Sequence, residues 1–146
     1  MQVTEGSIGR IFVLRLEDGD KFPDCIEEVA KEKRIESGLV FLVGGAKNGK
    51  MVTGPVKTTL SKPDSIIKRF SEAHEIMGVG TIFLSNNEPS LHLHAACGRG
   101  SDTIVGCTRP GVQTYLVAEV VILEMTGINA MRKQDPLSGF DLLNID

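Results

Sequence analysis

Residues 41–52 read FLVGGAKNGKMV, with a glycine pair and a turn dipeptide between two short apolar runs. The GGAKNGKM portion is similar to the phosphate-binding loop G-x-x-x-x-G-K-[ST], whose amides wrap the phosphates and whose final hydroxyl holds Mg²⁺. Met51 stands at the hydroxyl position and cannot bind Mg²⁺, and a Gly-Pro pair soon afterwards prevents the helix that such a loop must open. Asn48-Gly49 is a strong turn dipeptide. The stretch therefore predicts a strand, a turn and a second strand, and no nucleotide-binding site.

The longest strand pattern in the chain lies between Gln113 and Glu124. Both of its faces are apolar, which is typical of a central strand or of a strand that faces another subunit. Ile8–Leu16 shows a shorter pattern of the same kind, and an apolar stripe at helical spacing begins near Pro23, where a missing N–H is harmless. Further strands are expected at residues 39–43, 50–53, 75–84, 91–97 and 103–108.

These elements amount to one helix and about seven strands joined by short turns. Such an order favours an α+β fold, an α/β sandwich with a mainly antiparallel sheet and its principal helix after the first strand. The tail from Arg132 to Asp146 shows no regular pattern. We expect a single domain over residues 1–146, because this length suits one hydrophobic core and no linker interrupts it.

The composition is that of an ordinary globular protein with little attraction to nucleic acid. The net charge is −3 and no stretch is strongly basic, which leaves direct DNA binding with little electrostatic support. The sequence has no apolar run of transmembrane length and no signal-peptide pattern at its start. Its three cysteines, an odd number, fit a reducing compartment. We therefore expect a cytoplasmic protein without membrane association.

Two of the three histidines, His92 and His94, stand two residues apart. On a strand such residues point to the same side about 7 Å apart, so the two imidazoles can bind one metal ion. Zinc or a similar divalent ion takes nitrogen and sulfur ligands in a tetrahedral array, with one position open when the site is catalytic. The alternative is that both histidines are polar residues on a partly exposed or subunit-facing surface.

A third ligand is expected from the neighbouring strand, where Cys107 is the candidate. Simple pairing across the Gly98–Asp102 connection places His94 opposite Gly106 and turns the thiol to the other face. A one-residue bulge would bring Cys107 round to the histidines. The spacing alone leaves both arrangements open.

Two charged residues are candidates for a supporting role near the histidines. Glu119 stands among apolar neighbours, so its carboxylate either finds a partner, such as Arg109 or a histidine ring, or lies in water at a sheet edge. Arg109 is a candidate for binding an anion beside the histidines, and an ordinary surface role is its alternative.

Several short motifs occur in the order and spacing of one known family. They are an opening strand with an acidic turn, a Val-Gly-Gly-Ala segment, His-Glu-Ile before Gly-Thr-Ile, a Leu-His-Leu-His strand and a closing Asp-x-x-Ser-Gly-Phe, at residues 10–20, 43–46, 74–82, 91–94 and 135–140. Together they span nearly the whole chain. The sequence resembles the plants-and-prokaryotes-conserved (PPC) domain family, whose prokaryotic members are often called PD1-like DNA-binding proteins.

This resemblance implies a subunit built on an antiparallel sheet and assembled as a homotrimer. It also implies, for some members, a metal site made by the two histidines of the H-x-H strand and a third histidine in a Gly-Gly-His segment. His92 and His94 match the first two positions, but this chain reads Gly106-Cys107-Thr108 at the third. Cys107 therefore either replaces the imidazole with a thiolate, which zinc accepts, or leaves the site broken.

The plant members carry the domain beside an AT-hook, an Arg-Gly-Arg-Pro element that binds the minor groove. The nearest stretch here, Gly98–Ser101, lacks the second arginine and the proline. We therefore expect a trimeric module that binds a metal or a small molecule and has no established catalysis. The alternative is a metal-dependent hydrolase-like enzyme that uses the His-x-His site, a metal-bound water as nucleophile and Glu119 or Glu75 as base.

Overall fold

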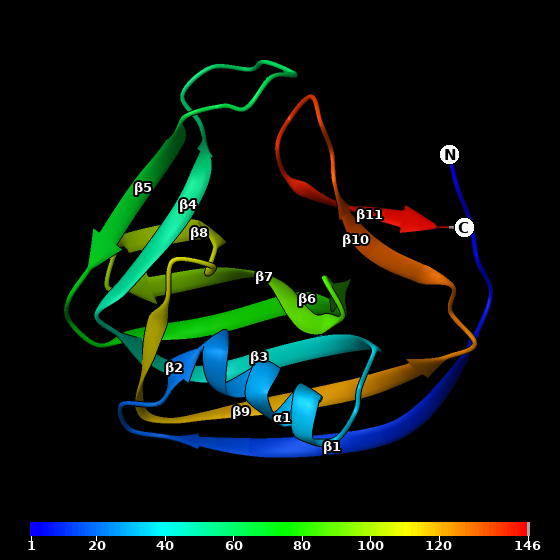
Figure 1. The fold of residues 1–146 in the computed structure, drawn as a ribbon. Coiled ribbons are helices and arrows are strands. Elements are labelled where there is room, and N and C mark those ends of the chain that lie inside the picture. The colour runs from blue at the N-terminus through cyan, green and yellow to red at the C-terminus, as the bar shows by residue number, and fades with distance from the viewer. Residues whose placement is uncertain (146) are drawn as a thin grey trace.

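A mainly antiparallel sheet with one helix packed on it forms the structure, a computed structural model that describes residues 1–145 (Figure 1). In chain order the elements are β1 (Ser7–Glu17), β2 (Lys21–Phe22), α1 (Asp24–Glu32), β3 (Ser37–Lys47), β4 (Gly49–Pro55), β5 (Ser65–Phe70), β6 (His74–Ser85), β7 (Glu88–Arg99), β8 (Asp102–Cys107), β9 (Val112–Thr126), β10 (Ala130–Gln134) and β11 (Asp141–Ile145). The described residues thus form eleven strands, more than the seven or so expected. The additional strands are β2, β5 and the pair β10 and β11.

The sheet has the strand order β1-β9-β3-β6-β7-β8-β4-β5. The long strand β9 pairs with both β1 and β3, so it is an interior strand, which agrees with the first of the two alternatives predicted from its apolar faces. Figure 1 shows β4 and β5 on one side, and the β10–β11 hairpin on the other, rising above the rest of the sheet. Among the described residues, no helix has the length and apolar character needed to cross a membrane.

One face of the sheet is covered and forms the core. The helix begins at Asp24, directly after Pro23 as expected, and buries Ile26 and Ala30 completely. The sheet contributes the inward-facing side chains of alternate residues, among them Val40, Leu42, Ile82, Leu91, Leu93, Ala118, Val120 and Ile122. We call the opposite, uncovered side the outer face of the sheet.

The glycine pair of the opening stretch lies where β3 runs closest to β9. A Cβ at Gly44 would collide with the backbone of Ala118, and a Cβ at Gly45 with the carbonyl oxygen of Tyr115. The pairing register of the two strands shifts at the same point. Asn48, with a φ of 48°, then makes the turn into β4. The predicted strand–turn–strand is confirmed, and the glycines serve the close approach of two strands.

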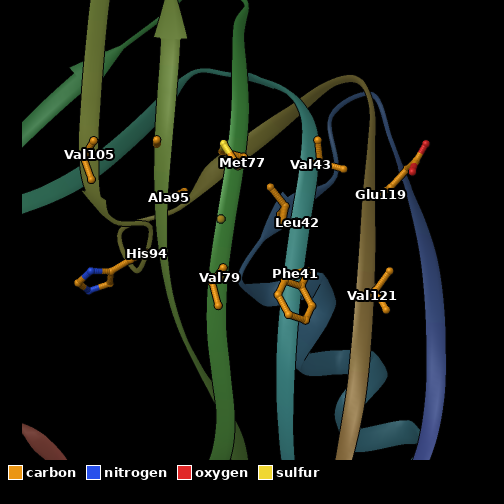
Figure 2. Close-up of a pocket in the computed structure, with 12 residues that line it drawn as sticks. Phe41, Leu42, Val43, Met77, Val79, His94, Ala95, Val105, Glu119 and Val121 are labelled. Atoms are coloured by element: carbon orange, nitrogen blue, oxygen red, sulfur yellow. The ribbon is translucent and has the colours of Figure 1, made fainter.

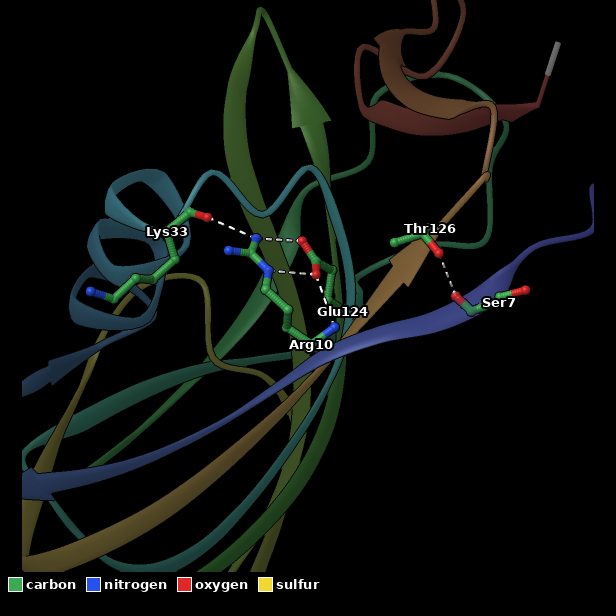
Figure 3. A network of polar contacts seen from close by, with 5 residues as sticks. All are labelled: Ser7, Arg10, Lys33, Glu124 and Thr126. Atoms are coloured by element: carbon green, nitrogen blue, oxygen red, sulfur yellow. Dashed lines mark hydrogen bonds and ion pairs between the residues drawn. The ribbon is translucent and has the colours of Figure 1, made fainter.

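One arginine on β1 adds side-chain links to the pairing between β1 and β9 (Figure 3). The Arg10 side chain donates two hydrogen bonds to the Glu124 carboxylate on β9, at 2.8 and 2.6 Å, and a third to the Lys33 carbonyl oxygen, at 2.9 Å. This pairing lowers the pKa of Glu124 from its ordinary value of 4.5 to about 2, chiefly through the Arg10 side-chain hydrogen bonds. The contacts join β1, β9 and the end of α1.

The expectation of an irregular tail after Arg132 is wrong. β10 and β11 form an antiparallel hairpin, and β10 also makes one parallel pairing with β6. Its turn is closed by the Asp135 carboxylate, which accepts hydrogen bonds from the Ser138 backbone N–H and hydroxyl at 2.7 and 2.6 Å. Most side chains of both strands are exposed or half-buried, which is why no clear alternation marks them in the sequence. Residue 146 lies outside the described residues.

Candidate metal centre

His94 and Cys107 lie directly opposite each other across the β7–β8 ladder. The register follows from a two-residue turn, Gly100-Ser101, and differs by one from the simple pairing that places His94 opposite Gly106. The ladder needs no bulge to achieve this. Because directly paired residues point to the same side of a sheet, the thiol of Cys107 lies with the histidines.

Three side chains therefore converge on the outer face at this point. The Nε2 atoms of His92 and His94 are 3.0 Å apart, with the rings edge to face at 76°. One ligand atom from each of His92, His94 and Cys107 lies within 4.8 Å of the other two. Two imidazole nitrogens at about 2.0–2.1 Å from a tetrahedral zinc ion are roughly 3.3 Å apart, so the spacing of the two rings fits such an ion closely.

The surroundings keep the inner histidine neutral. His92 is half-buried, and burial lowers its pKa to about 4, with further lowering by the charges of His94, Arg109 and Arg132. A neutral imidazole offers the lone pair that a metal ligand needs. Cys107 is buried, His92 is half-buried and His94 is exposed, so the exposure of the three candidate ligands increases from the interior to the surface.

Two arginines line the same cleft as the three candidate ligands. Arg109 lies there as an exposed side chain, in the position expected from the sequence. Arg132, which was not among the residues expected at the site, reaches the cleft from β10. Its position in the cleft depends on the β10–β11 hairpin, which the sequence of the tail did not predict. No local sequence pattern therefore marks Arg132 as a site residue.

Arg132 is held firmly by the protein. Only 7% of its surface is exposed, and Nη2 donates hydrogen bonds to the carbonyl oxygen and hydroxyl of Thr81 at 3.1 and 3.0 Å. The guanidinium also lies 5.6 Å from the centre of the Phe83 ring. Burial lowers the pKa of Arg132, as does the charge of Arg109, whereas Asp141 and Cys107 act in the opposite direction.

Glu119 is not brought to the histidines within one chain. Along the paired strands, Val43 on β3 and Met77 on β6 lie between Glu119 and Ala96 on β7, a distance of three strand spacings or roughly 14 Å. Its side chain is exposed on the outer face although β9 is an interior strand of the sheet. Figure 2 shows His94 and Glu119 at opposite sides of a shallow groove on this face.

Glu75, the other carboxylate considered as a base, is also distant. It pairs with Gly98, four positions along the β6–β7 ladder from His94, or roughly 13 Å. The neighbouring His74 packs against Phe70 in a tilted arrangement with 4.6 Å between ring centres, and its Nδ1 lies 2.7 Å from the Glu72 carbonyl oxygen. The third histidine therefore takes no part in the cluster.

The groove on the outer face is apolar apart from its two ends. It crosses β9, β3, β6, β7 and β8 and is lined by the side chains of Phe41, Val43, Met77, Val79, Val105 and Val121, which stand on neighbouring strands (Figure 2). Several of these side chains are more than half exposed, with Met77 at 66% and Val105 at 61%. An exposed apolar surface of this extent is characteristic of a protein interface.

The fold and this cluster define a sheet-dominated domain with a single helix and a pair of histidines on its outer face. The family model described as the Plants and Prokaryotes Conserved (PCC) domain matches residues 3–126. The chain belongs to this family, which confirms the resemblance drawn from the motifs. A comparison with curated proteins finds no match.

Solved structures share the whole fold at low sequence identity. A metal-containing protein from Archaeoglobus fulgidus is 24% identical, with a TM-score of 0.85 and 99% of each chain covered. A plant- and prokaryote-conserved protein from Pyrococcus horikoshii is 22% identical, with a TM-score of 0.81 over 99% of this chain and 100% of that one. A Bacteroides thetaiotaomicron protein, whose description suggests DNA binding, is 20% identical, with a TM-score of 0.75 over 97% of this chain and 99% of that one. At these identities the likeness establishes the fold alone.

Proposed function

We propose that this protein is a homotrimeric, cytoplasmic metal-binding module that holds zinc through Nε2 of His92, Nε2 of His94 and Sγ of Cys107. The observation that carries the proposal is the convergence of these three ligand atoms within 4.8 Å. Two imidazoles and one thiolate are a ligand set that zinc accepts, and they leave a fourth position open. The fold-level likeness to a protein described as metal-containing is consistent with this assignment.

Bound zinc would supply a Lewis acid with one open position. The chain contributes two oriented imidazoles, a thiol on the same face and two arginines in the adjoining cleft. The hydrolase-like alternative needs a base, but Glu119 and Glu75 lie roughly 13–14 Å away along the sheet. We therefore favour binding over hydrolysis.

The outer face supports the trimer. Met77, Val79 and Phe41 expose 66%, 53% and 43% of their surfaces in the single chain, at the middle of the sheet rather than at its rim. Covering this surface with further copies of the chain removes it from water, which stabilises the assembly by about 25 cal/mol per Å² of apolar area. Direct DNA binding is not part of the proposal, because the net charge of −3 disfavours it. Retention on a DNA column at low salt would contradict that view.

Zinc titration of the metal-free protein, followed by elemental analysis after dialysis, tests the site. We expect about one zinc ion per chain, and loss of most of it in Cys107→Ser and in His94→Ala. Cys25→Ser is the matched control, because Cys25 lies on α1, outside the cluster, and should leave zinc binding unchanged. A wild-type chain that retains no zinc, or a Cys107→Ser chain that retains as much as the control, would rule the proposal out.

A further inference from the structure

A cleft of about 590 Å³ adjoins the proposed zinc ligands. One side of it comes from β7 and β8, and the other from the β10–β11 hairpin. Arg109 and Arg132 both line it, and Asp141 is the acidic residue among its walls. Among residues 1–145, the ion pairs of the structure involve neither arginine. The cleft therefore carries an excess of positive charge, which bound zinc would increase.

Arg132 has unused hydrogen-bonding capacity in this cleft. Thr81 accepts from Nη2 only, while Nε is buried and finds no acceptor in the described part of the chain. A buried donor without a partner costs about 1–3 kcal/mol, so such groups are rare and usually have a functional reason. A second arginine beside it adds to the demand for an acidic acceptor. Carboxylate and phosphate oxygens match the fork geometry of a guanidinium.

The remainder of the cleft is apolar. Phe140, Leu142 and Leu143 come from the start of β11 and the residue before it, and expose 37%, 49% and 42% of their surfaces. Leu142 and Leu143 are neighbours on a strand, so their side chains point to opposite sides of β11. The three residues together line the cleft and offer an apolar wall to a molecule bound beside the arginines. A bare inorganic anion would leave this wall in contact with water.

We propose that the cleft binds a small organic carboxylate with an apolar substituent. Its carboxylate accepts hydrogen bonds from Arg109 and Arg132, and its apolar part lies against the wall formed by Phe140 and the start of β11. When zinc is bound, the carboxylate also faces the open position of the metal, and this part of the proposal rests on the proposed function. The two arginine contacts do not require the metal. The metal-free protein therefore retains weaker binding.

Isothermal titration calorimetry with phenylacetate as probe, on zinc-loaded and on metal-free protein, tests the proposal. Phenylacetamide is the uncharged match, and inorganic phosphate is an anion without an apolar part. We expect phenylacetate to bind at least about tenfold more tightly than either, because charge-assisted hydrogen bonds to the arginines require the carboxylate and the apolar wall requires the ring. Equal affinity for the amide, or tighter binding of phosphate, would overturn it.

Variants locate the binding on the arginines. Arg109→Gln should weaken phenylacetate binding by about ten- to a hundredfold. Arg132→Lys keeps the charge but loses the fork, so it should weaken binding as well. Arg99→Gln, on the same β7–β8 hairpin but outside the cleft, should leave the affinity unchanged. An equal loss in Arg99→Gln and Arg109→Gln would contradict the assignment.

The two proposals fail separately. Suppose that the chain takes up no zinc, that the metal-free protein binds phenylacetate, and that Arg109→Gln abolishes this binding. The proposed zinc site is then wrong and the proposed carboxylate site stands. If the chain takes up zinc but neither form binds phenylacetate, the carboxylate site is wrong and the zinc site stands.

Discussion

The Nε2 atoms of His92 and His94 lie 3.0 Å apart on the outer face of β7, and Cys107 is paired directly opposite His94 on the next strand, β8. The His-x-His spacing predicted that the two rings would share a face, and they do. The position of the thiol was open, because it depends on whether the hairpin turn contains two or three residues. A one-residue change in register turns a side chain to the other face of a sheet.

Replacing Cys107 with histidine should preserve the proposed site with a changed ligand set. Cys107→His supplies an imidazole where the thiol stood, so we expect it to retain cobalt or zinc, whereas Cys107→Ala should bind either metal much more weakly. Cobalt(II) substitution with absorption spectroscopy distinguishes the forms. The wild-type protein should show a thiolate-to-cobalt charge-transfer band, and Cys107→His should show cobalt absorption without that band. The same band in both proteins would exclude Cys107 as a ligand.

A charge placed on the outer face should dissociate the proposed trimer. Val79 lies on β6 near the middle of this face with 53% of its surface exposed, so Val79→Glu would bury a carboxylate in the interface at high cost. We expect the wild-type protein to elute at three times the 15.8 kDa chain mass and the variant at a lower multiple, measured by size-exclusion chromatography with light scattering. Leu137→Glu, at an exposed position in the β10–β11 turn, is the control and should not change the mass. A wild-type monomer would contradict the trimer outright.

The sequence predicted those parts of the fold whose pattern is local. The helix after Pro23, the turn at Asn48-Gly49 and the interior position of β9 each follow from propensity and periodicity, and each is confirmed. That β3 and β4 pair with other strands and not with each other could not be read from the turn. The β10–β11 hairpin was missed because its short strands leave most side chains exposed, so that burial imposes no alternation. Arg132 was missed with it. Its partners on β6 lie far away in the sequence, and only the folded chain brings them together.

Alanine at Gly45 should destabilise the protein because the added Cβ has no room. The Tyr115 carbonyl oxygen occupies that space, and as part of the β9 backbone it cannot rotate away. We expect Gly45→Ala to lower the free energy of unfolding by about 1–3 kcal/mol, measured by urea denaturation at a fixed protein concentration. At Gly98, by contrast, the nearest atom to an added Cβ is 3.8 Å away, so Gly98→Ala should change the stability by no more than about 0.5 kcal/mol. Equal effects at the two positions would show that the close approach of β3 to β9 is not what requires glycine.

The Arg10–Glu124 pair should make the stability depend on pH in acid. The folded-state pKa of Glu124 is lowered to about 2 from an ordinary 4.5. A carboxyl group whose pKa is lower in the folded state contributes stability above its unfolded pKa, and this contribution is lost as the pH falls toward the folded value. The wild-type protein should therefore lose stability between about pH 5 and pH 2 more steeply than Glu124→Gln, which cannot ionise there.

Thermal unfolding of both proteins at half-unit intervals of pH measures this difference. We expect Glu124→Gln to be less stable than the wild type at pH 7, with the gap between their melting temperatures narrowing toward pH 2 because protonated Glu124 resembles the amide. The matched control is Glu17→Gln, because the Glu17 side chain is 73% exposed and its carboxylate is paired with Arg15. Exposed pairs contribute little, so this variant should follow the wild-type curve closely. If the gap between wild type and Glu124→Gln stayed constant from pH 7 to pH 2, the ion pair with Arg10 would not be the source of the stabilisation, and the link between β1 and β9 would rest on strand pairing and packing.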